Sequence, residues 1–516
     1  MQLAKVVECA EGGKTMGKKR KLLINTVMGV VQQLVTVICG FILPRFFLKN
    51  YGSEVNGLIT SLTQFLSFIS LLEMGIGPVV QANLYKPLSE KNLERISEIV
   101  KSSERFFRKI ACVFLVYIVA LSVIFPISVA AEFDPWFTVS LLLIIAISTF
   151  TQYFFGATYH ILLNSDQKSY VHMSIQTVAV IINTAISIVL MHMGAPVHAV
   201  KLISATIFVF RPLLMMTYVR KRYKLNMNIQ LIDEPIKQKW NGFAQHVASP
   251  VSANANTVIL SFFSSLSNIS IYSVYNMVTG GLTNIIATGY LGVDSYFGNV
   301  ISRNDENEIR KSFEFIELVT HGIVTVIFTI AAISMIPFVT VYTKDIHDAN
   351  YIQPKFGILL VAAFMVRCIR MPYHSIINAA GHFKETQTGS FIMVAINIIL
   401  STALVFVLGL PGVAIGLLVS MLFHLFYFVW YLKSNIIHRP IYVFIKYLIS
   451  DIFIAIISVL ASQIISFGEP TWINFFLYLI KSGFITLGIS ILMNIIFNFR
   501  MVKSGFRKLL FRTKNK

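Results

Sequence analysis

The sequence contains few cysteines and few acidic residues. Its four cysteines, Cys9, Cys39, Cys112 and Cys368, form no Cys-x-x-Cys pair. None of them has a histidine at a spacing typical of zinc ligands. We therefore expect no disulfide and no metal site.

Long polar stretches and phosphate-binding loops are also missing. The chain is 55% hydrophobic and 13% charged, and no polar stretch exceeds about thirty residues, which leaves no room for a sizeable soluble domain. No Gly-x-x-x-x-Gly-Lys-Ser/Thr loop is present, so we expect no ATP hydrolysis. These absences indicate a membrane protein that is not an enzyme and needs no cofactor.

Long apolar stretches follow one another along the whole chain. A helix of about 20 residues crosses the hydrocarbon core of a bilayer, and each stretch reaches about that length. The predicted fold is therefore an all-α polytopic membrane protein with about 14 transmembrane helices. The expected spans are 22–48, 56–83, 110–131, 136–163, 170–193, 196–219, 238–262, 270–298, 313–343, 354–378, 386–409, 412–433, 444–467 and 472–499.

Basic residues are distributed unevenly between the two sides of these spans. The chain has 43 Lys and Arg against 24 Asp and Glu, and most of the basic residues lie in the two tails and in alternate links. The opposite links and span ends carry Lys49, Lys201, Lys344 and Lys355. By the positive-inside rule, we expect a multi-pass protein of the bacterial inner membrane with both termini cytoplasmic. The net charge of +19 then reflects attraction to membrane lipids rather than nucleic-acid binding.

The sequence repeats itself at long range. Tyr159-His160-x-x-x-Asn164 recurs in the second half as Tyr373-His374-x-x-x-Asn378, and we call two residues that are separated by this same offset repeat equivalents. Because six spans separate the copies, both halves enter the membrane in the same orientation, which predicts two parallel-repeat six-helix lobes plus two C-terminal helices. The expected parts are a basic tail (1–21), an N-lobe (22–219), a linker (220–237), a C-lobe (238–433), two further spans (434–499) and a second basic tail (500–516).

Positive charges within the spans suggest an anionic substrate. Arg367, Arg370 and His374 share one face of the predicted span 354–378, and an arginine inside a membrane is costly unless it meets water or a counter-charge. Such a face suits a phosphate-bearing ligand. Further substrate-binding candidates within the spans are Lys481, Arg211 and Arg45. The alternative is that these arginines pair with structural carboxylates such as Glu73 or Asp294.

Two acids and two amides are candidates for coupling an ion. Glu73 and Asp294 occupy related places in the two halves, where they could exchange a proton or lock helices together. Asn254 and Asn256 lie in the unusually polar span 238–262, which is typical either of a helix lining water or of helix-to-helix hydrogen bonding.

Several short motifs resemble a known family. Leu43-Pro44-Arg45, Tyr51-Gly52, Leu72-Glu73-Met74-Gly75, Gly381-x-Phe383-Lys384 and Gly412-Val413-Ala414-Ile415-Gly416 are similar to segments of Wzx-type O-antigen and capsule repeat-unit flippases. This polysaccharide-biosynthesis family belongs to the MOP superfamily of MATE-like exporters, and the resemblance covers essentially the whole chain.

The resemblance implies a flippase for an undecaprenyl-diphosphate-linked oligosaccharide in O-antigen or other lipopolysaccharide biosynthesis. It implies alternating access, H⁺ or Na⁺ as the coupling ion of an antiporter, and a polysaccharide polymerase as a partner. The alternatives are a MATE-like multidrug exporter, a lipid II flippase, or an integral-membrane glycan polymerase. For the polymerase, Glu132-x-Asp134 is the acidic pair in an outer link.

Overall fold

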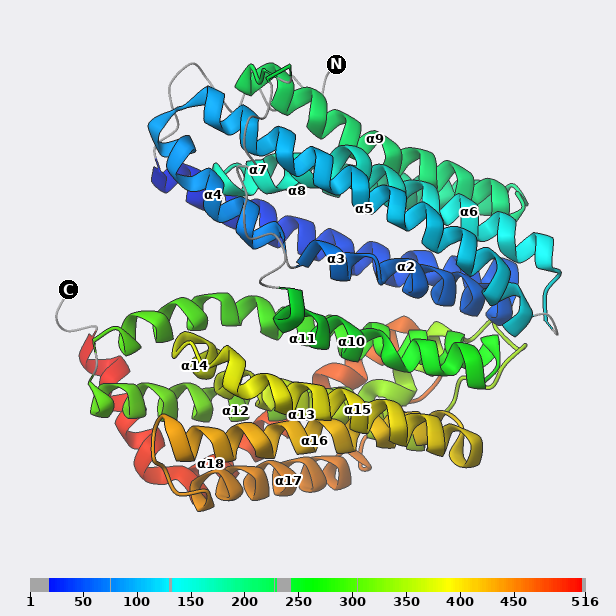
Figure 1. Ribbon diagram of the computed structural model, residues 1–516. Helices are drawn as coiled ribbons and strands as arrows, with labels where there is room; N and C mark the ends of the chain where they lie inside the picture. Colours follow the sequence, from blue (N-terminus) through cyan, green and yellow to red (C-terminus); the bar gives the residue numbers. More distant parts are fainter. Residues whose placement is uncertain are drawn as a thin grey trace. The chain divides into compact units, whose positions relative to one another are not determined.

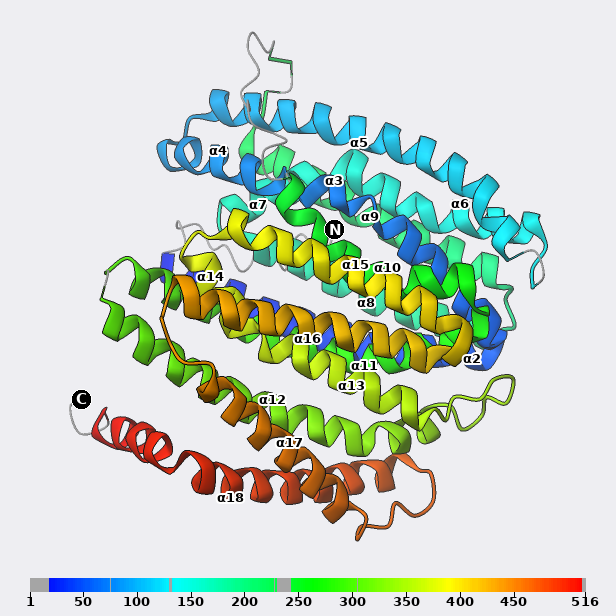
Figure 2. The same ribbon diagram turned by 60° about the horizontal axis from the view of Figure 1, so that its bottom comes forward.

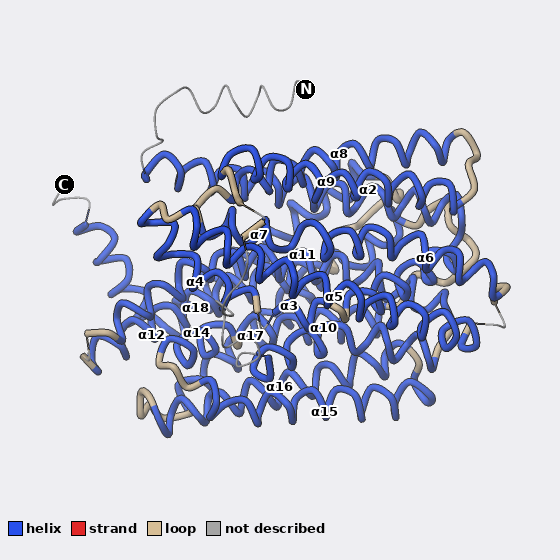
Figure 3. Tube along the Cα trace, turned by 45° about the horizontal axis from the view of Figure 1, so that its top comes forward, coloured by secondary structure: helices blue, strands red, loops and turns tan. Residues whose placement is uncertain are grey.

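The computed structural model describes residues 18–74, 76–129, 132–226, 228–229, 243–303 and 305–512. Within these ranges all the regular elements are helices (Figure 3). The predicted tail up to residue 17, most of the linker (230–237) and the end of the chain (513–516) lie outside them. The chain divides into two compact units, Met1–Val251 and Ser252–Lys516, with the boundary inside helix α10.

The first unit contains the helices that Figure 1 colours from blue through cyan to the green of α9. These are α2 (Lys18–Ser67), α3 (Ser70–Met74), α4 (Gly77–Glu90), α5 (Leu93–Ser128), α6 (Pro135–Thr151), the π-helical turn η1 (Gln152–Gly156), α7 (Ala157–Ser165), α8 (Ser169–His192) and α9 (Val197–Tyr223). Helix α10 (Phe243–Phe263) begins in this unit and ends in the second.

The second unit contains eight further helices. These are α11 (Leu266–Ile301), α12 (Glu306–Tyr342), α13 (Pro354–Ile369), α14 (Met371–Ala379), α15 (Phe383–Leu408), α16 (Leu410–Asn435), α17 (Tyr442–Ser462) and α18 (Trp472–Arg512).

Eleven helical segments of the described chain are long and apolar enough to cross a membrane. They include one continuous segment, Leu23–Ser67, where the sequence predicted two spans. Gly52 interrupts it with φ 82° and ψ 175°, a conformation that glycine adopts easily. The second predicted span is instead completed by α3 and α4. Helices α10 and α11 have the length of spans but carry more Ser, Thr, Asn and Gly, which lowers their apolar character. The prediction of an all-α polytopic membrane protein is confirmed.

The predicted repeat is visible in matching irregularities of the two units. The fourth predicted span is broken by η1 (Gln152–Gly156), and the tenth is broken around Arg370, between α13 and α14. The two breaks are related by the sequence repeat, since Gly156 and Arg370 are repeat equivalents. Helices α5 and α12 also begin alike, since Asn92 and Asp305 accept hydrogen bonds from the first-turn amides of the helices that they cap.

Glycines bring α15 and α16 into close contact (Figure 2). A Cβ atom at Gly416 would lie 2.6 Å from the backbone nitrogen of Ser401, which is too close for two packed helices. We expect Gly416→Ala to lower the stability of the folded protein by about 1–3 kcal/mol through overpacking. Thermal unfolding of purified variants measures this, with Gly488→Ala as the control because no heavy atom lies within 4 Å of that site. Equal stability of the two variants would contradict the proposed packing.

Candidate functional site

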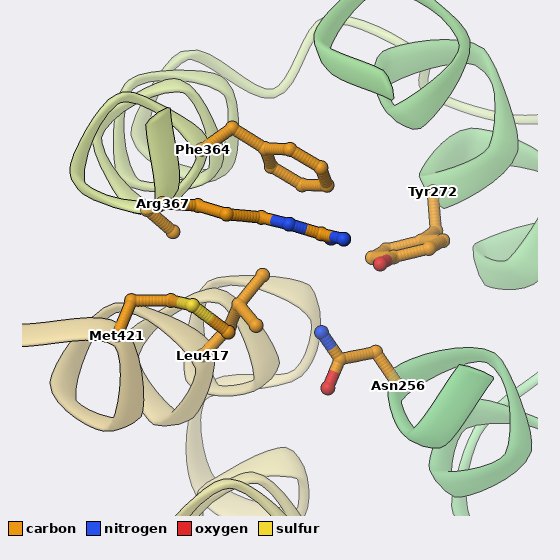
Figure 4. Close-up of a pocket in the computed structure, with 7 residues that line it drawn as sticks. Asn256, Tyr272, Phe364, Arg367, Leu417 and Met421 are labelled. Carbon is orange, nitrogen blue, oxygen red and sulfur yellow. The ribbon is translucent and has the colours of Figure 1, made fainter. Parts of the chain in front are cut away.

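Arg367 lines a small cleft in the second unit (Figure 4). Its guanidinium extends beside the ring of Phe364, 5.9 Å from the ring centroid, and points toward Tyr272. Asn256, from α10, forms a hydrogen bond with the Tyr272 hydroxyl and leaves its own Oδ1 without a partner. The cleft has room for a water-sized group, so a larger ligand requires side chains to move.

Arg370 lies at the break between α13 and α14 and contacts a second helix. Its Nη1 donates to Nδ1 of the buried His424 on α16 at 2.9 Å, and its Cζ lies 5.4 Å from the centroid of the Phe428 ring. Nε2 of His424 then donates to Ser390 on α15 at 3.3 Å. Pro372 is the second residue of the following helix, α14. Because proline has no backbone N–H, the regular hydrogen bonding of the helix is interrupted at this break. Within the described ranges, the Nε atom of Arg370 is buried without a hydrogen-bond partner.

The first unit holds an arginine at a comparable helix crossing. Arg211 on α9 donates to Gln176 on α8, and to Gln152 in η1 at 2.7 Å. Gln176 is the repeat equivalent of Ser390, so Arg211 contacts directly the repeat position that Arg370 reaches through His424. Arg211 comes from the sixth predicted span of the first unit, whereas Arg370 comes from the fourth predicted span of the second unit.

A glycine explains why the arginine comes from different spans in the two units. Gly156 is the repeat equivalent of Arg370, and a Cβ atom there would lie 2.8 Å from Cβ of Pro212. The first unit thus has no room for a side chain at this position of its fourth predicted span. Arg211, which precedes Pro212 on α9, provides the positive charge instead.

Arg211, Arg367 and Arg370 share one electrostatic property. Within the described part of the chain, their polar partners are neutral amides, a phenol and an imidazole, and none of the three forms an ion pair with a carboxylate. A buried charge without a counter-charge is strongly unfavourable. This arrangement makes each arginine a potential anion-binding group.

The two acids suggested as partners for these arginines interact with hydroxyl groups. Glu73 accepts a hydrogen bond from Tyr153, the repeat equivalent of Arg367. Asp294 is exposed and accepts a hydrogen bond from Ser375. The structure therefore gives these carboxylates a different role from neutralising the three arginines.

The remaining predicted residues are more scattered. His374 is exposed, bonds Asn378 at 3.2 Å and stacks at 6.0 Å from Phe428, so it extends the Arg370 surface by one turn. Lys481 is exposed on α18, which packs on α12 and α17. Arg45 and Asn254 are half-buried on α2 and α10.

Each unit also contains a Glu–Tyr–Arg cluster that the sequence analysis missed. In the first, Glu104 accepts from Tyr159 at 2.5 Å, and Arg220 donates to the Tyr159 hydroxyl at 3.0 Å. In the second, Glu317 accepts from Tyr373 and from both terminal nitrogens of Arg439, with Nη2 at 2.6 Å. Both glutamates lie at the same distance along the chain from the cap of their helix.

These clusters differ in burial. The Arg439 side chain is 7% exposed and Glu317 is 0% exposed, whereas the Arg220 side chain is 45% exposed. Burial disfavours the charged form of Arg439, but the hydrogen bonds and charge of Glu317 outweigh it and raise the pKa of this guanidinium. Arg439 therefore stays protonated at physiological pH, and its guanidinium remains available to pair with Glu317.

Part of what was missed has a signal in the sequence. Tyr159 and Tyr373 belong to the recognised repeat, and their partners Glu104 and Glu317 lie at the same distance along the chain from Asn92 and Asp305. Buried His424 has no counterpart at the repeat offset, where Phe210 stands, so the repeat could not have identified it.

Comparisons with known proteins establish the fold. No protein-family profile matches the sequence, and no curated protein sequence matches it. The structure is similar to that of the lipid II flippase MurJ in an inward closed conformation, with a TM-score of 0.69 and 15% identity over 93% of this chain and 100% of MurJ.

Two conformations of a multidrug-resistance MATE transporter of the MOP superfamily are also similar. The inward-facing structure has a TM-score of 0.62 and 11% identity over 80% of this chain and 98% of the transporter. The outward-facing one has a TM-score of 0.54 and 12% identity over 81% and 98%. The chain is therefore a multi-pass membrane protein with the fold of MurJ and the MATE transporters.

Proposed function

We propose that this protein is a flippase that moves an undecaprenyl-diphosphate-linked oligosaccharide repeat unit from the cytoplasmic to the periplasmic leaflet of a bacterial inner membrane. The fold that it shares with a lipid flippase and with alternating-access transporters supports transport rather than an enzymatic reaction. In this proposal the lipid tail stays in the bilayer while the diphosphate and sugars cross.

The observation that carries this proposal is the set of half-buried arginines that form no ion pair with a carboxylate within the described part of the chain. Arg367 and Arg370 are three residues apart in the second unit, and each has guanidinium nitrogens available for a ligand. A diphosphate supplies several oxygens that accept paired hydrogen bonds from guanidinium groups. Asn256 and Tyr272 add polar contacts in the same cleft. We assign His374 a secondary role on the same surface.

A second candidate is a lipid II flippase, which the similarity to MurJ favours. Export of cationic drugs is less compatible, since positive charges in a binding site repel such substrates. The two flippase candidates differ in the sugar carried, and a polysaccharide polymerase would use the product of the first.

Deleting the protein in its host tests the proposal. We expect the lipid-linked repeat unit to accumulate with its sugars confined to the cytoplasmic leaflet and to be absent from the cell surface. Accumulation of lipid II instead would support the second candidate, and normal amounts of both intermediates would contradict both.

The proposed orientation places both termini in the cytoplasm. Cysteines introduced at the exposed Asp345 and Glu469 should then react with an impermeant thiol reagent in intact cells. Cysteines at Lys91 and Asp305, also exposed, should react only after the membrane is opened. Labelling of the second pair in intact cells would show that the orientation is reversed.

A further inference from the structure

Helices α12, α17 and α18 pack on one another (Figure 2) and face each other with polar side chains. We name these buried residues the polar seam. They are Glu317, His321, Thr325 and Thr329 on α12, Ser450, Asp451, Ser458 and Ser462 on α17, and Ser482, Thr486 and Ser490 on α18. They recur at intervals of about one turn on α12 and α18 and of one to two turns on α17, so the seam runs along the bundle. Small polar residues alone would serve to pack membrane helices.

An ionisable pair lies in this seam. Nδ1 of His321 is 2.5 Å from Oδ2 of Asp451, and the two side chains are 3% and 5% exposed. The His321 ring stacks on Tyr447 with the centroids 5.2 Å apart. Ionisable residues within membrane helices are rare and typically functional. Asp451 is the only acidic residue of its helix.

The pair has an unoccupied acceptor. Since Nδ1 donates to the carboxylate, Nε2 of the neutral ring carries a lone pair, and this buried atom has no hydrogen-bond partner among the described residues. In the same part of the chain, five buried hydroxyls of the seam also have no partner: those of Thr325, Thr329, Ser450, Ser458 and Thr486. Unsatisfied buried polar groups are unfavourable. Their concentration in one seam needs an explanation beyond helix packing.

The charges around His321 favour uptake of a proton. On its own helix, Glu317 is already neutralised by Arg439 and bonded by Tyr373 from α14, and Glu314 pairs with Arg310 at 3.3 Å. Helix α17 contributes Asp451 and Tyr447, and α18 contributes hydroxyls to the seam while Lys481 is exposed. With a neutral ring, the His321–Asp451 pair carries one uncompensated negative charge. One proton at Nε2 converts it into an imidazolium–carboxylate pair with no net charge, which is less costly to bury.

We propose that the His321–Asp451 pair is the proton-binding site through which a proton gradient drives this protein. One proton binds at Nε2 of His321 and is released from the same atom, while the seam hydroxyls provide hydrogen-bond partners along its route. The inference rests on the proposed transport function for its physiological role. It assigns the coupling to the contact between α12 and α17 rather than to Glu73 or Asp294.

Proton binding can be measured without any substrate. The full chain, labelled with ¹⁵N-histidine and reconstituted in lipid nanodiscs, is titrated from mildly alkaline to mildly acidic buffer by infrared difference spectroscopy. The chain has 11 histidines, so the signal of His321 is the difference between the wild-type and His321→Gln spectra, and we expect this difference to contain an imidazole protonation band. Asp451→Asn keeps an acceptor for Nδ1 but removes the charge, and it should also lose the band from this range. His198→Gln is the matched control, because His198 bonds Ser140 at 2.8 Å far from the seam along the chain.

Coupling is measured in proteoliposomes with a fluorescent undecaprenyl-diphosphate oligosaccharide as the probe. A gradient of one pH unit coupled to one proton can concentrate the probe about tenfold in one leaflet. His321→Gln and Asp451→Asn should lose this asymmetry while exchange without a gradient stays within about twofold of wild type.

The outcomes separate the two proposals. Identical histidine bands in wild type and His321→Gln overturn the proton site, and so does normal gradient-driven asymmetry in both variants. Loss of exchange in Asp451→Asn together with lowered thermal stability also overturns it, because the pair is then structural. A titrating band in a wild-type protein that does not move the probe supports the proton site and contradicts the proposed substrate.

Discussion

Replacing both Arg367 and Arg370 with alanine is expected to abolish surface glycan while leaving the amount of membrane-inserted protein near normal. A hydrogen bond to a charged group contributes about 1.5–3 kcal/mol, so losing both guanidinium groups should reduce transport by about 100-fold or more. Folding should tolerate the change, since neither arginine forms an ion pair whose loss would leave a buried carboxylate behind. Quantitative surface-glycan staining and membrane immunoblotting measure the two effects.

Lysine replacements separate charge from geometry. Arg367→Lys and Arg370→Lys keep the positive charge but lose the planar pair of donors, so partial transport is expected. The matched control is Arg303→Ala, which removes an exposed arginine that pairs with Glu308 at 3.1 Å. Normal surface glycan in the double alanine variant would contradict an anion site at these positions.

The second large effect is expected from the Glu317–Arg439 pair. Arg439→Ala leaves the fully buried Glu317 without its counter-charge, with Tyr373 as its remaining partner. Breaking a buried ion pair on one side typically destabilises a protein by about 3–5 kcal/mol. We therefore expect this variant to lose most of its folded yield, as measured by size-exclusion chromatography and thermal unfolding in detergent.

The first unit provides the comparison. Arg220→Ala removes the corresponding guanidinium, which is half-exposed and lies 3.8 Å from Glu104, and Arg108 remains 3.3 Å from the same carboxylate. The expected loss of stability is about 1 kcal/mol or less. Adding Glu317→Gln to Arg439→Ala should restore much of the folded yield, because the uncompensated charge is then removed. Equal losses in Arg220→Ala and Arg439→Ala would contradict the difference in burial.

Span length and long-range repeats were sufficient to predict most of the fold. Apolar runs long enough to cross a bilayer predicted the helices, and the copies of Tyr-His-x-x-x-Asn predicted that two units are alike. The kink at Gly52 and the separate helices α3 and α4 were not predicted, because a run of apolar residues does not show where a glycine leaves the helical conformation. The break at η1 was missed for a similar reason, since a π-helical turn depends on packing around Gly156.

The site was predicted in part. Intramembrane Arg367 and Arg370 stood out by type alone, and Asn256 stood out by the polarity of its helix. That Arg367 and Asn256 line one cleft could not be predicted, because it depends on how α10, α11, α13 and α16 pack. Residue type also singled out Lys481, which is exposed on its helix and stays a prediction. Residue type gave too little weight to His321 and Asp451, which are 130 positions apart in the chain and meet only in the folded unit.

One measurement tests the central claim most directly. The purified protein is reconstituted into liposomes that carry a fluorescent undecaprenyl-diphosphate oligosaccharide, and a membrane-impermeant quencher reports the fraction of probe in the outer leaflet over time. We predict that wild-type protein exchanges the probe between leaflets, that Arg367→Ala/Arg370→Ala protein does so at about 1% of that rate or less, and that excess inorganic diphosphate slows the wild type. Exchange at the same rate by wild-type and double-variant protein, unaffected by diphosphate, would contradict the account.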